Sequence, residues 1–285
     1  MNEVKYPEYR QYQEISIDVN NAVMSLLAGS RIANHAIVNN GTQNQQLADI
    51  FPTVEHIDRF NLRVGPATKY LSAADDHLAS MEITYALAVH EDFVTSAIEF
   101  ARSAGVNVSS SRPITAKSMH RVLFNALGYT ARPESTECFQ LLRCMRNAVV
   151  HAGRRVQQEL TNQISNMSPA AVQEWQRLNG QPPSDVVQQA ELVLVASHIF
   201  SAFAVIKQLG RDISAALAAT IPVRVWAEVC VQDFQESTKN NRNSSGWRRA
   251  LIGYARSRYG PVNIPESDLE SAARTLGLWT IASWQ

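Results

Sequence analysis

Helical periodicity between widely spaced prolines constrains the fold of this chain more than any other feature. In one proline-free stretch, residues 67–104, apolar residues recur at steps of four, five and seven positions, and a glycine follows at position 105. Such steps place apolar side chains on one face of a helix, and glycine commonly ends a helix. The recurring residues are Leu71, Leu78, Ile83, Leu87, Val94 and Ile98. We therefore expect an all-α protein.

Capping residues and breakers predict where several other helices begin and end. Ser168 followed by Pro169 is a typical N-cap with proline at the first helical position, and Ser184 is expected to cap the most apolar helix. Gly128 and Gly153 are expected to end helices. The predicted helices cover residues 9–38, 116–127, 136–152, 168–176 and 184–220.

The C-terminal part is also expected to be helical. The stretch VRVWAEVCV at 223–231 is rich in β-branched residues, but a lone strand in a helical protein has no partner, so we expect a helix. Ser267 and Glu270 have the spacing of a capping box at the start of the last helix. Three consecutive parts are predicted: an N-terminal helical extension (1–67), a helical bundle (68–220) and a C-terminal helical region (221–285).

Composition and charge exclude several classes of protein. The chain has 285 residues, of which 45% are hydrophobic, and its 26 basic and 26 acidic side chains cancel, so net charge indicates neither nucleic acid nor an anionic membrane. Three cysteines without metal-ligand spacing fit a reducing compartment. The polar N-terminus lacks the apolar core of a signal peptide, and the apolar residues 192–206 are too few to span a bilayer. We expect a cytoplasmic protein that does not enter a membrane.

The strongest candidate for a functional site is the stretch RNAVVHAG, residues 146–153. When residues 139–153 are projected on an ideal helix at about 100° per residue, Arg143, Asn147 and His151 form one polar stripe. Arg146 lies at its boundary, and Val150 falls in the polar face. The opposite, core face carries Leu141, Leu142, Met145, Ala148, Val149 and Ala152.

The residue types on this face suit phosphodiester chemistry. An arginine grips phosphate oxygens with a planar fork of donors, and a histidine exchanges protons near neutral pH. His151 also lies in the last turn, where the helix dipole favours the imidazolium form. The interval between Arg146 and His151 is itself expected by chance in a chain with this many arginines and histidines. The alternative, a solvated polar face with a histidine near the helix end, therefore stays open.

The fuller pattern resembles the signature of the HEPN superfamily. That signature is an arginine, a polar residue, a few variable positions and a histidine at the end of an amphipathic helix, which here are Arg146, Asn147 and His151. The flanking FQLLRCM at 139–145 and Ala152-Gly153 are also similar to the HEPN helix. The motif covers residues 139–153, and the resemblance as a bundle extends over about 68–220. It implies a HEPN-like helical bundle with additional N- and C-terminal helices.

The resemblance implies a metal-independent endoribonuclease without a cofactor that acts as a homodimer. Arg146 would bind the scissile phosphate, His151 would transfer a proton during attack of the ribose 2′-hydroxyl, and Asn147 matches the polar position of the family. Such proteins include toxins restrained by an antitoxin and antiviral defence effectors, so an antitoxin or defence partner protein is expected beside the RNA. From its place on the same stripe, Arg143 is expected to be a second phosphate contact. Val150 would pack at the dimer seam.

A second candidate for RNA binding is the basic segment, residues 239–259 (KNNRNSSGWRRALIGYARSRY). Arg248 and Arg249 are expected to bind the phosphate backbone, while Trp247, Tyr254 and Tyr259 stack on bases. The alternative is a solvated helix whose aromatic side chains face the core. Two other functions stay open: a non-catalytic HEPN-like interaction module and a helical regulator that binds nucleic acid through this segment.

Other candidate clusters favour structural roles. Consecutive helical residues such as Asp75, Asp76 and His77, with Glu82 and residues 90–92, point away from one another and do not converge on a metal ion. His198, in the most apolar helix, is expected to be a hydrogen-bonded core residue. Cys138, Cys144 and Cys230 are expected to be buried. The chain contains no phosphate-binding glycine loop or dinucleotide fingerprint, so ATP- or NAD-dependent chemistry is not expected.

Overall fold

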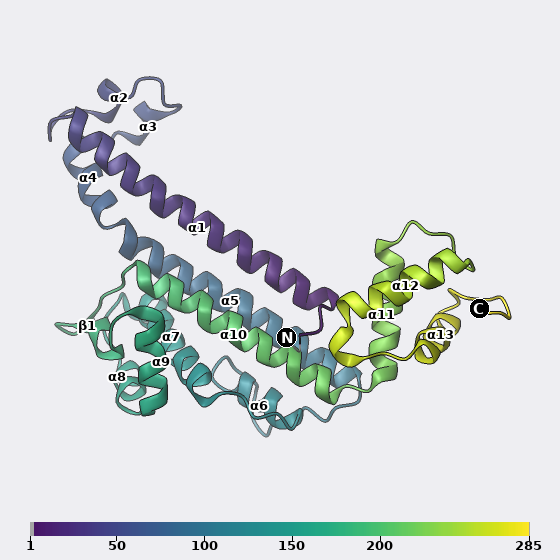
Figure 1. Cartoon of the computed structure of the whole chain (residues 1–285). Helices are drawn as coiled ribbons and strands as arrows, with labels where there is room; N and C mark the ends of the chain where they lie inside the picture. Colours follow the sequence, from purple (N-terminus) through teal and green to yellow (C-terminus); the bar gives the residue numbers. More distant parts are fainter. Residues whose placement is uncertain (1–2, 285) are drawn as a thin grey trace. The chain divides into compact units, whose positions relative to one another are not determined.

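The computed structural model describes residues 3–284, and the protein is all-α except for one short hairpin (Figure 1). The elements are α1 (Pro7–Asn40), α2 (Leu47–Ile50), α3 (Ile57–Phe60), α4 (Val64–Ser72), α5 (Ala74–Ser103), α6 (Met119–Ala126), α7 (Pro133–Ala152), α8 (Gln158–Ser165), α9 (Pro169–Asn179), η1 (Pro183–Val186), β1 (Val187–Gln188), β2 (Glu191–Leu192), α10 (Ala196–Thr220), α11 (Val223–Ser237), α12 (Ser245–Arg258), η2 (Gly260–Val262) and α13 (Glu266–Thr275).

Several predictions from caps and periodicity are confirmed. The Ser168 hydroxyl accepts a hydrogen bond from the Ala171 amide at 3.2 Å, and Pro169 begins α9. Gly153 follows the last residue of α7 with φ of 54°, the left-handed conformation in which glycine avoids a Cβ clash. The β-branched stretch 223–231 lies in helix α11. These features depend on neighbours in the sequence, so the sequence predicts them well.

Three boundaries predicted from the sequence are wrong. The helix expected at 67–104 is two helices, because α4 ends at Ser72 and Ala73 leaves helical geometry. The helix expected from Ser184 begins only at Ala196, after η1 and the hairpin β1–β2. Ser267 lies inside α13 and does not cap it, since the N-cap is Pro265, whose side chain cannot accept a hydrogen bond.

The chain forms two compact units, each assembled from separate stretches, whereas the sequence predicted consecutive domains. The first unit comprises Met1–Ile15, Ala88–Thr136 and Val205–Gln285, and the second comprises Ser16–Leu87 and Glu137–Ala204. Among the described residues, no single helix has the length and apolar character to cross a membrane; the sharply bent pair α10 and α11 meets those criteria only together.

Aromatic packing and a buried ion pair hold the first unit together. Tyr12 stacks on Phe93 with ring centroids 4.3 Å apart. Arg10 donates two hydrogen bonds to Asp233, at 2.7 and 2.8 Å, and the Tyr259 hydroxyl donates a third at 2.7 Å. The hydrogen bonds and charge of Arg10 outweigh the effect of burial and keep the pKa of the Asp233 carboxyl below its ordinary value.

Figure 1 shows α2 and α3 beside the C-terminal end of α1 and the start of α4 in the second unit. An apolar cluster joins these four helices, and the chain before α2 pairs with the chain before α4 through a bridge between Gln46 and Arg63. Helix α7 also contributes to the hydrophobic core of this unit, because four residues on the face that was predicted to be buried are fully buried. These are Leu141, Leu142, Met145 and Ala148.

Candidate functional site

The C-terminal end of α7 presents the residues of the RNAVVHAG stretch. His151 is exposed in the last turn, and half of the Val150 surface is accessible (50%). The predicted exposure of Val150 is therefore confirmed. Because Met145 and Ala148 anchor the opposite face in the core, the helix holds His151 and Val150 outward.

The chain just after α7 is fixed by an ion pair with α5. Arg154 has φ of 72°, a conformation that costs a non-glycine residue about 1–2 kcal/mol. Its guanidinium donates two hydrogen bonds to the Asp76 carboxylate and one to the Leu192 carbonyl at 3.2 Å. Burial alone would raise the pKa of Asp76, but its hydrogen bonds and contacts with Arg154 outweigh this and lower the pKa. The ion pair thus stabilises the turn that follows His151.

The hairpin β1–β2 holds the same turn from the other side. The Leu192 amide donates to the Arg154 carbonyl at 2.8 Å, and the Val156 amide donates to the Ala190 carbonyl at 3.0 Å. Arg155 forms an isolated bridge with Glu191. The backbone from Arg154 to Val156 is therefore positioned by main-chain bonds, which set where the chain enters α8.

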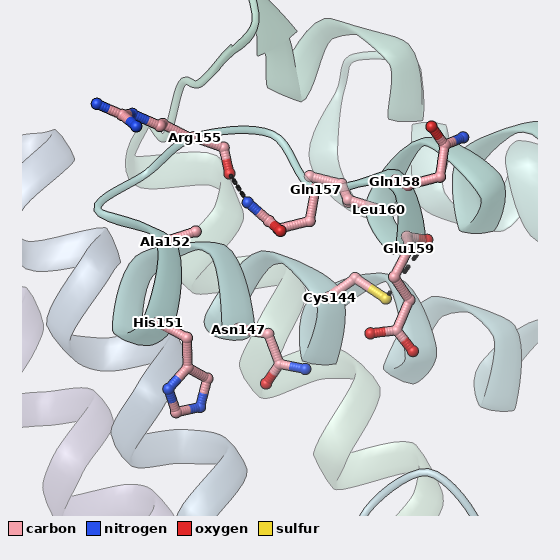
Figure 2. Close-up of a pocket in the computed structure, with 9 residues that line it drawn as sticks. All are labelled: Cys144, Asn147, His151, Ala152, Arg155, Gln157, Gln158, Glu159 and Leu160. Carbon is pink, nitrogen blue, oxygen red and sulfur yellow. Dashed lines mark hydrogen bonds between the residues drawn. The ribbon is translucent and has the colours of Figure 1, made fainter.

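A pocket of about 580 Å³ lies between the end of α7 and the start of α8 (Figure 2). Its lining is mostly polar and includes His151, which Figure 2 shows leaving α7 on the same side as Asn147. The volume falls in the range of about 300–1,000 Å³ that is typical of small-molecule sites. The lining residues are Cys144, Asn147, His151, Ala152, Arg155, Gln157, Gln158, Glu159 and Leu160.

Arg146 does not line this pocket, but it contacts Asn147, which does. The Arg146 side chain is half-buried, and its Nε donates to the Asn147 Oδ1 at 3.1 Å. This bond fixes the orientation of the Asn147 amide. The structure therefore brings His151 and Asn147 to one pocket and places Arg146 beside Asn147.

Arg143 lies in a different environment from the rest of its stripe. Only 6% of its surface is accessible, because α8 covers it. Its guanidinium donates to Glu159 Oε1 at 2.7 Å and to Gln140 Oε1 at 2.8 Å. A contact between Arg143 and a phosphate would require it to leave Glu159, so the structure gives this arginine a structural role in fixing that carboxylate.

The basic segment forms the loop after α11 and the whole of α12. Trp247 and Tyr259 are fully buried, so neither ring is exposed for stacking on a base. Burial and the nearby Asp233 carboxylate raise the pKa of the half-buried Tyr254. Arg249 is exposed, whereas the Arg248 Nε is buried without a hydrogen-bond partner. Phosphate binding by these two arginines stays a prediction, and Arg249 is the more accessible.

The other candidate clusters make structural contacts. No three His, Cys, Asp or Glu side chains in residues 3–284 come together as a metal site, and Asp75 and Asp76 pair with Arg31 and Arg154. His198 is buried, and its Nδ1 accepts a hydrogen bond from the Val195 amide at 2.9 Å, as a cap of α10. The three cysteines are buried.

The contribution of α8 to the site was not predicted from the sequence. Arg155, Gln157, Gln158 and Glu159 line the pocket, but they follow the glycine that ends α7 and carry no motif of their own. Only the fold of the turn around Arg154 returns α8 against α7. The burial of Arg143 on an otherwise polar stripe was the one signal that a partner lay there, and it is visible only in the structure.

Comparisons with known proteins identified no relative of this chain. No family model, no curated protein and no solved structure matches the chain.

Proposed function

We propose that this protein is a metal-independent endoribonuclease of the HEPN type. The observation that carries the proposal is the exposed His151 imidazole at a polar pocket that also contains Asn147 and Arg155. An imidazole and a guanidinium in one pocket are suited to proton transfer beside an anionic substrate. The pocket is open to the surface, as a polymer substrate requires.

In the proposed reaction, His151 accepts the proton of a ribose 2′-hydroxyl as its oxygen attacks the adjacent phosphorus. The bond from phosphorus to the 5′-oxygen of the next nucleotide breaks, which leaves a 2′,3′-cyclic phosphate and a 5′-hydroxyl. Arg146 stabilises the charge that develops on the phosphate oxygens. It lies five residues before His151, about 7.5 Å along the helix axis.

We propose that a second copy of the chain completes the site. One protomer has one His151, whereas the reaction needs a proton acceptor and a proton donor for the leaving 5′-oxygen. The exposed Val150 next to His151 and the exposed Met81 (66%) on α5 offer apolar surface to a partner. A toxin or antiviral role, with a restraining partner protein, would follow from this activity.

The test is incubation of the purified protein with total RNA in EDTA. His151→Ala is expected to lower the cleavage rate by about 10²–10⁴-fold, and Arg146→Ala to lower it comparably. His35→Ala is the matched control, because His35 is also an exposed helical histidine in the second unit but lies outside the pocket. An unchanged rate in His151→Ala would overturn the catalytic assignment.

The second candidate function is a non-catalytic dimerisation module. The exposed apolar side chains Val150 and Met81 favour it, since they suit a partner surface whether or not cleavage occurs. Sedimentation of the wild type and of Val150→Asp distinguishes the two functions. A dimer that dissociates in the variant, combined with no RNA cleavage by the wild type, would favour the interaction module.

A further inference from the structure

The turn after α7 depends on one residue in an unfavourable backbone conformation. Arg154 follows the glycine that ends α7 and has φ of 72°, a conformation that glycine adopts much more readily than other residues. Its amide donates a hydrogen bond to the Ala148 carbonyl at 2.9 Å, and such a bond closes a Schellman motif at a helix end. A residue keeps such a conformation only where the surrounding structure holds it firmly, and such residues are frequent at functional sites.

Three further groups hold Arg154 in place. Its guanidinium donates two hydrogen bonds to the Asp76 carboxylate on α5 and one to the Leu192 carbonyl at 3.2 Å. The Arg154 carbonyl accepts a hydrogen bond from the Leu192 amide at 2.8 Å. The Leu194 amide donates to Asp76 Oδ1 at 3.3 Å, so the carboxylate is itself fixed by the chain that follows β2. The bonds of this one residue therefore join α7, α5 and the hairpin β1–β2.

The ion pair between Asp76 and Arg154 is suited to hold a fixed geometry. A carboxylate that accepts bonds from two nitrogens of one guanidinium fixes its direction as well as its distance. The side chains of Asp76 and Arg154 are only 28% and 31% exposed, so solvent and salt screen this pair less than an exposed one. The neighbouring Asp75, by contrast, accepts one hydrogen bond at 3.0 Å from Arg31, whose side chain is 68% exposed.

His151 lies between the two ends of this helix-ending motif. The hydrogen bond from Arg154 to Ala148 closes a loop of chain that includes His151, and Figure 2 shows His151, Ala152 and Arg155 along the end of α7 and the turn. A shift of Arg154 would therefore move the backbone of His151 relative to the pocket. Displacement of a catalytic group by about 1 Å can lower a rate by about 10²-fold.

We propose that Asp76 and Arg154 are positioning residues for the reaction, which hold the end of α7 in the place from which His151 lines the pocket. The inference rests on the proposed ribonuclease function. Neither residue lines the pocket, so both act through the backbone of the turn and not by contact with RNA. Loss of either side chain is expected to lower kcat and to change substrate binding little.

The first experiment measures RNA cleavage in EDTA by Asp76→Asn, Arg154→Ala and the double variant. Each single variant is expected to lower kcat by about 10²-fold, with KM within about threefold of the wild type. The double variant is expected to be no slower than the slower single variant, because residues that act as a unit are not additive. Asp75→Asn is the matched control, since it removes the neighbouring carboxylate of the same helix and a different ion pair. An unchanged kcat in Asp76→Asn would overturn the positioning role.

Arg154→Gly separates the ion pair from the backbone conformation, because glycine adopts a φ of 72° without a Cβ clash. This variant keeps the conformation of the turn but lacks the guanidinium. It is expected to melt no lower than Arg154→Ala and to have the same low kcat. A kcat in Arg154→Gly equal to that of the wild type would show that the backbone conformation alone positions His151, and would overturn the role of the ion pair.

Amide hydrogen exchange, followed residue by residue by NMR, tests the hold on the turn without RNA. The Arg154 amide, which is bonded to the Ala148 carbonyl, is expected to exchange at least about tenfold faster in Asp76→Asn than in the wild type. Asp75→Asn is expected to leave this rate unchanged. Faster exchange in Asp76→Asn, combined with a wild type that cleaves no RNA, would support the hold of the pair on the turn and overturn the ribonuclease proposal alone. An unchanged exchange rate in Asp76→Asn would overturn the inference whether or not the wild type cleaves RNA.

Discussion

Two buried histidines in the first unit predict that the protein loses stability in mild acid. His90 Nε2 and His120 Nε2 are 2.8 Å apart, and His90 Nδ1 is 2.9 Å from the Tyr12 hydroxyl. Tyr12 donates its proton to the Ile206 carbonyl at 2.8 Å. It therefore accepts from His90 Nδ1–H, and His90 Nε2 in turn accepts from His120 Nε2–H. This chain of bonds requires the His90 imidazole to be neutral, and burial disfavours the charged form of His120.

The expected loss can be worked out for His120. Burial lowers the pKa of His120 from 6.5 to about 4, and burial together with the nearby His120 lowers the pKa of His90. Because the folded-state pKa lies below the unfolded one, the unfolded chain binds the proton first as pH falls. Stability is full above about pH 6.5 and is lost between that pH and about 4. Between pH 7.5 and 5, His120 alone accounts for about 2 kcal/mol.

The assay is urea unfolding, followed by circular dichroism, at several pH values between 7.5 and 5. His120→Gln keeps an N–H donor but cannot titrate. Between pH 7.5 and 5, its free energy of unfolding is therefore expected to fall by about 2 kcal/mol less than that of the wild type. His35→Gln, which removes an exposed histidine, should follow the wild type. Parallel pH curves for wild type and His120→Gln would refute the reasoning.

Further predictions concern backbone space and the basic segment. Gly210→Ala is expected to destabilise by about 1 kcal/mol, since the new Cβ would lie 2.6 Å from the Tyr12 ring, and this overpacking outweighs the better helix propensity. Gly29→Ala, where a Cβ meets nothing within 4 Å, should stabilise by up to about 1 kcal/mol in the same unfolding assay. Ala190→Gly is expected to raise the melting temperature slightly, because Ala190 has a φ of 66° and this conformation costs a non-glycine residue about 1 kcal/mol. A lower melting temperature would contradict this. Arg249→Glu should reduce the salt slope of RNA binding by about one, and an unchanged slope would show that Arg249 touches no phosphate.

The sequence by itself determined the features that depend on near neighbours. The periodic apolar residues of α7 predicted its core face, and Ser168 and Gly153 predicted helix ends, because a cap or a helix face involves side chains only a few positions apart. The exposure of His151 and Val150 followed from the same projection. The all-α class followed from the sum of such segments.

Only the tertiary structure decided what surrounds those residues. The hairpin after η1 takes the place of the first part of the predicted helix because its backbone pairs with residues 154–156, a contact between distant parts of the chain. Arg143 was predicted to be exposed, but it is buried because α8 covers it and supplies Glu159 as its partner. Helical spacing places a side chain on a face, but the burial and the charge partner of that face depend on which distant segment packs against it.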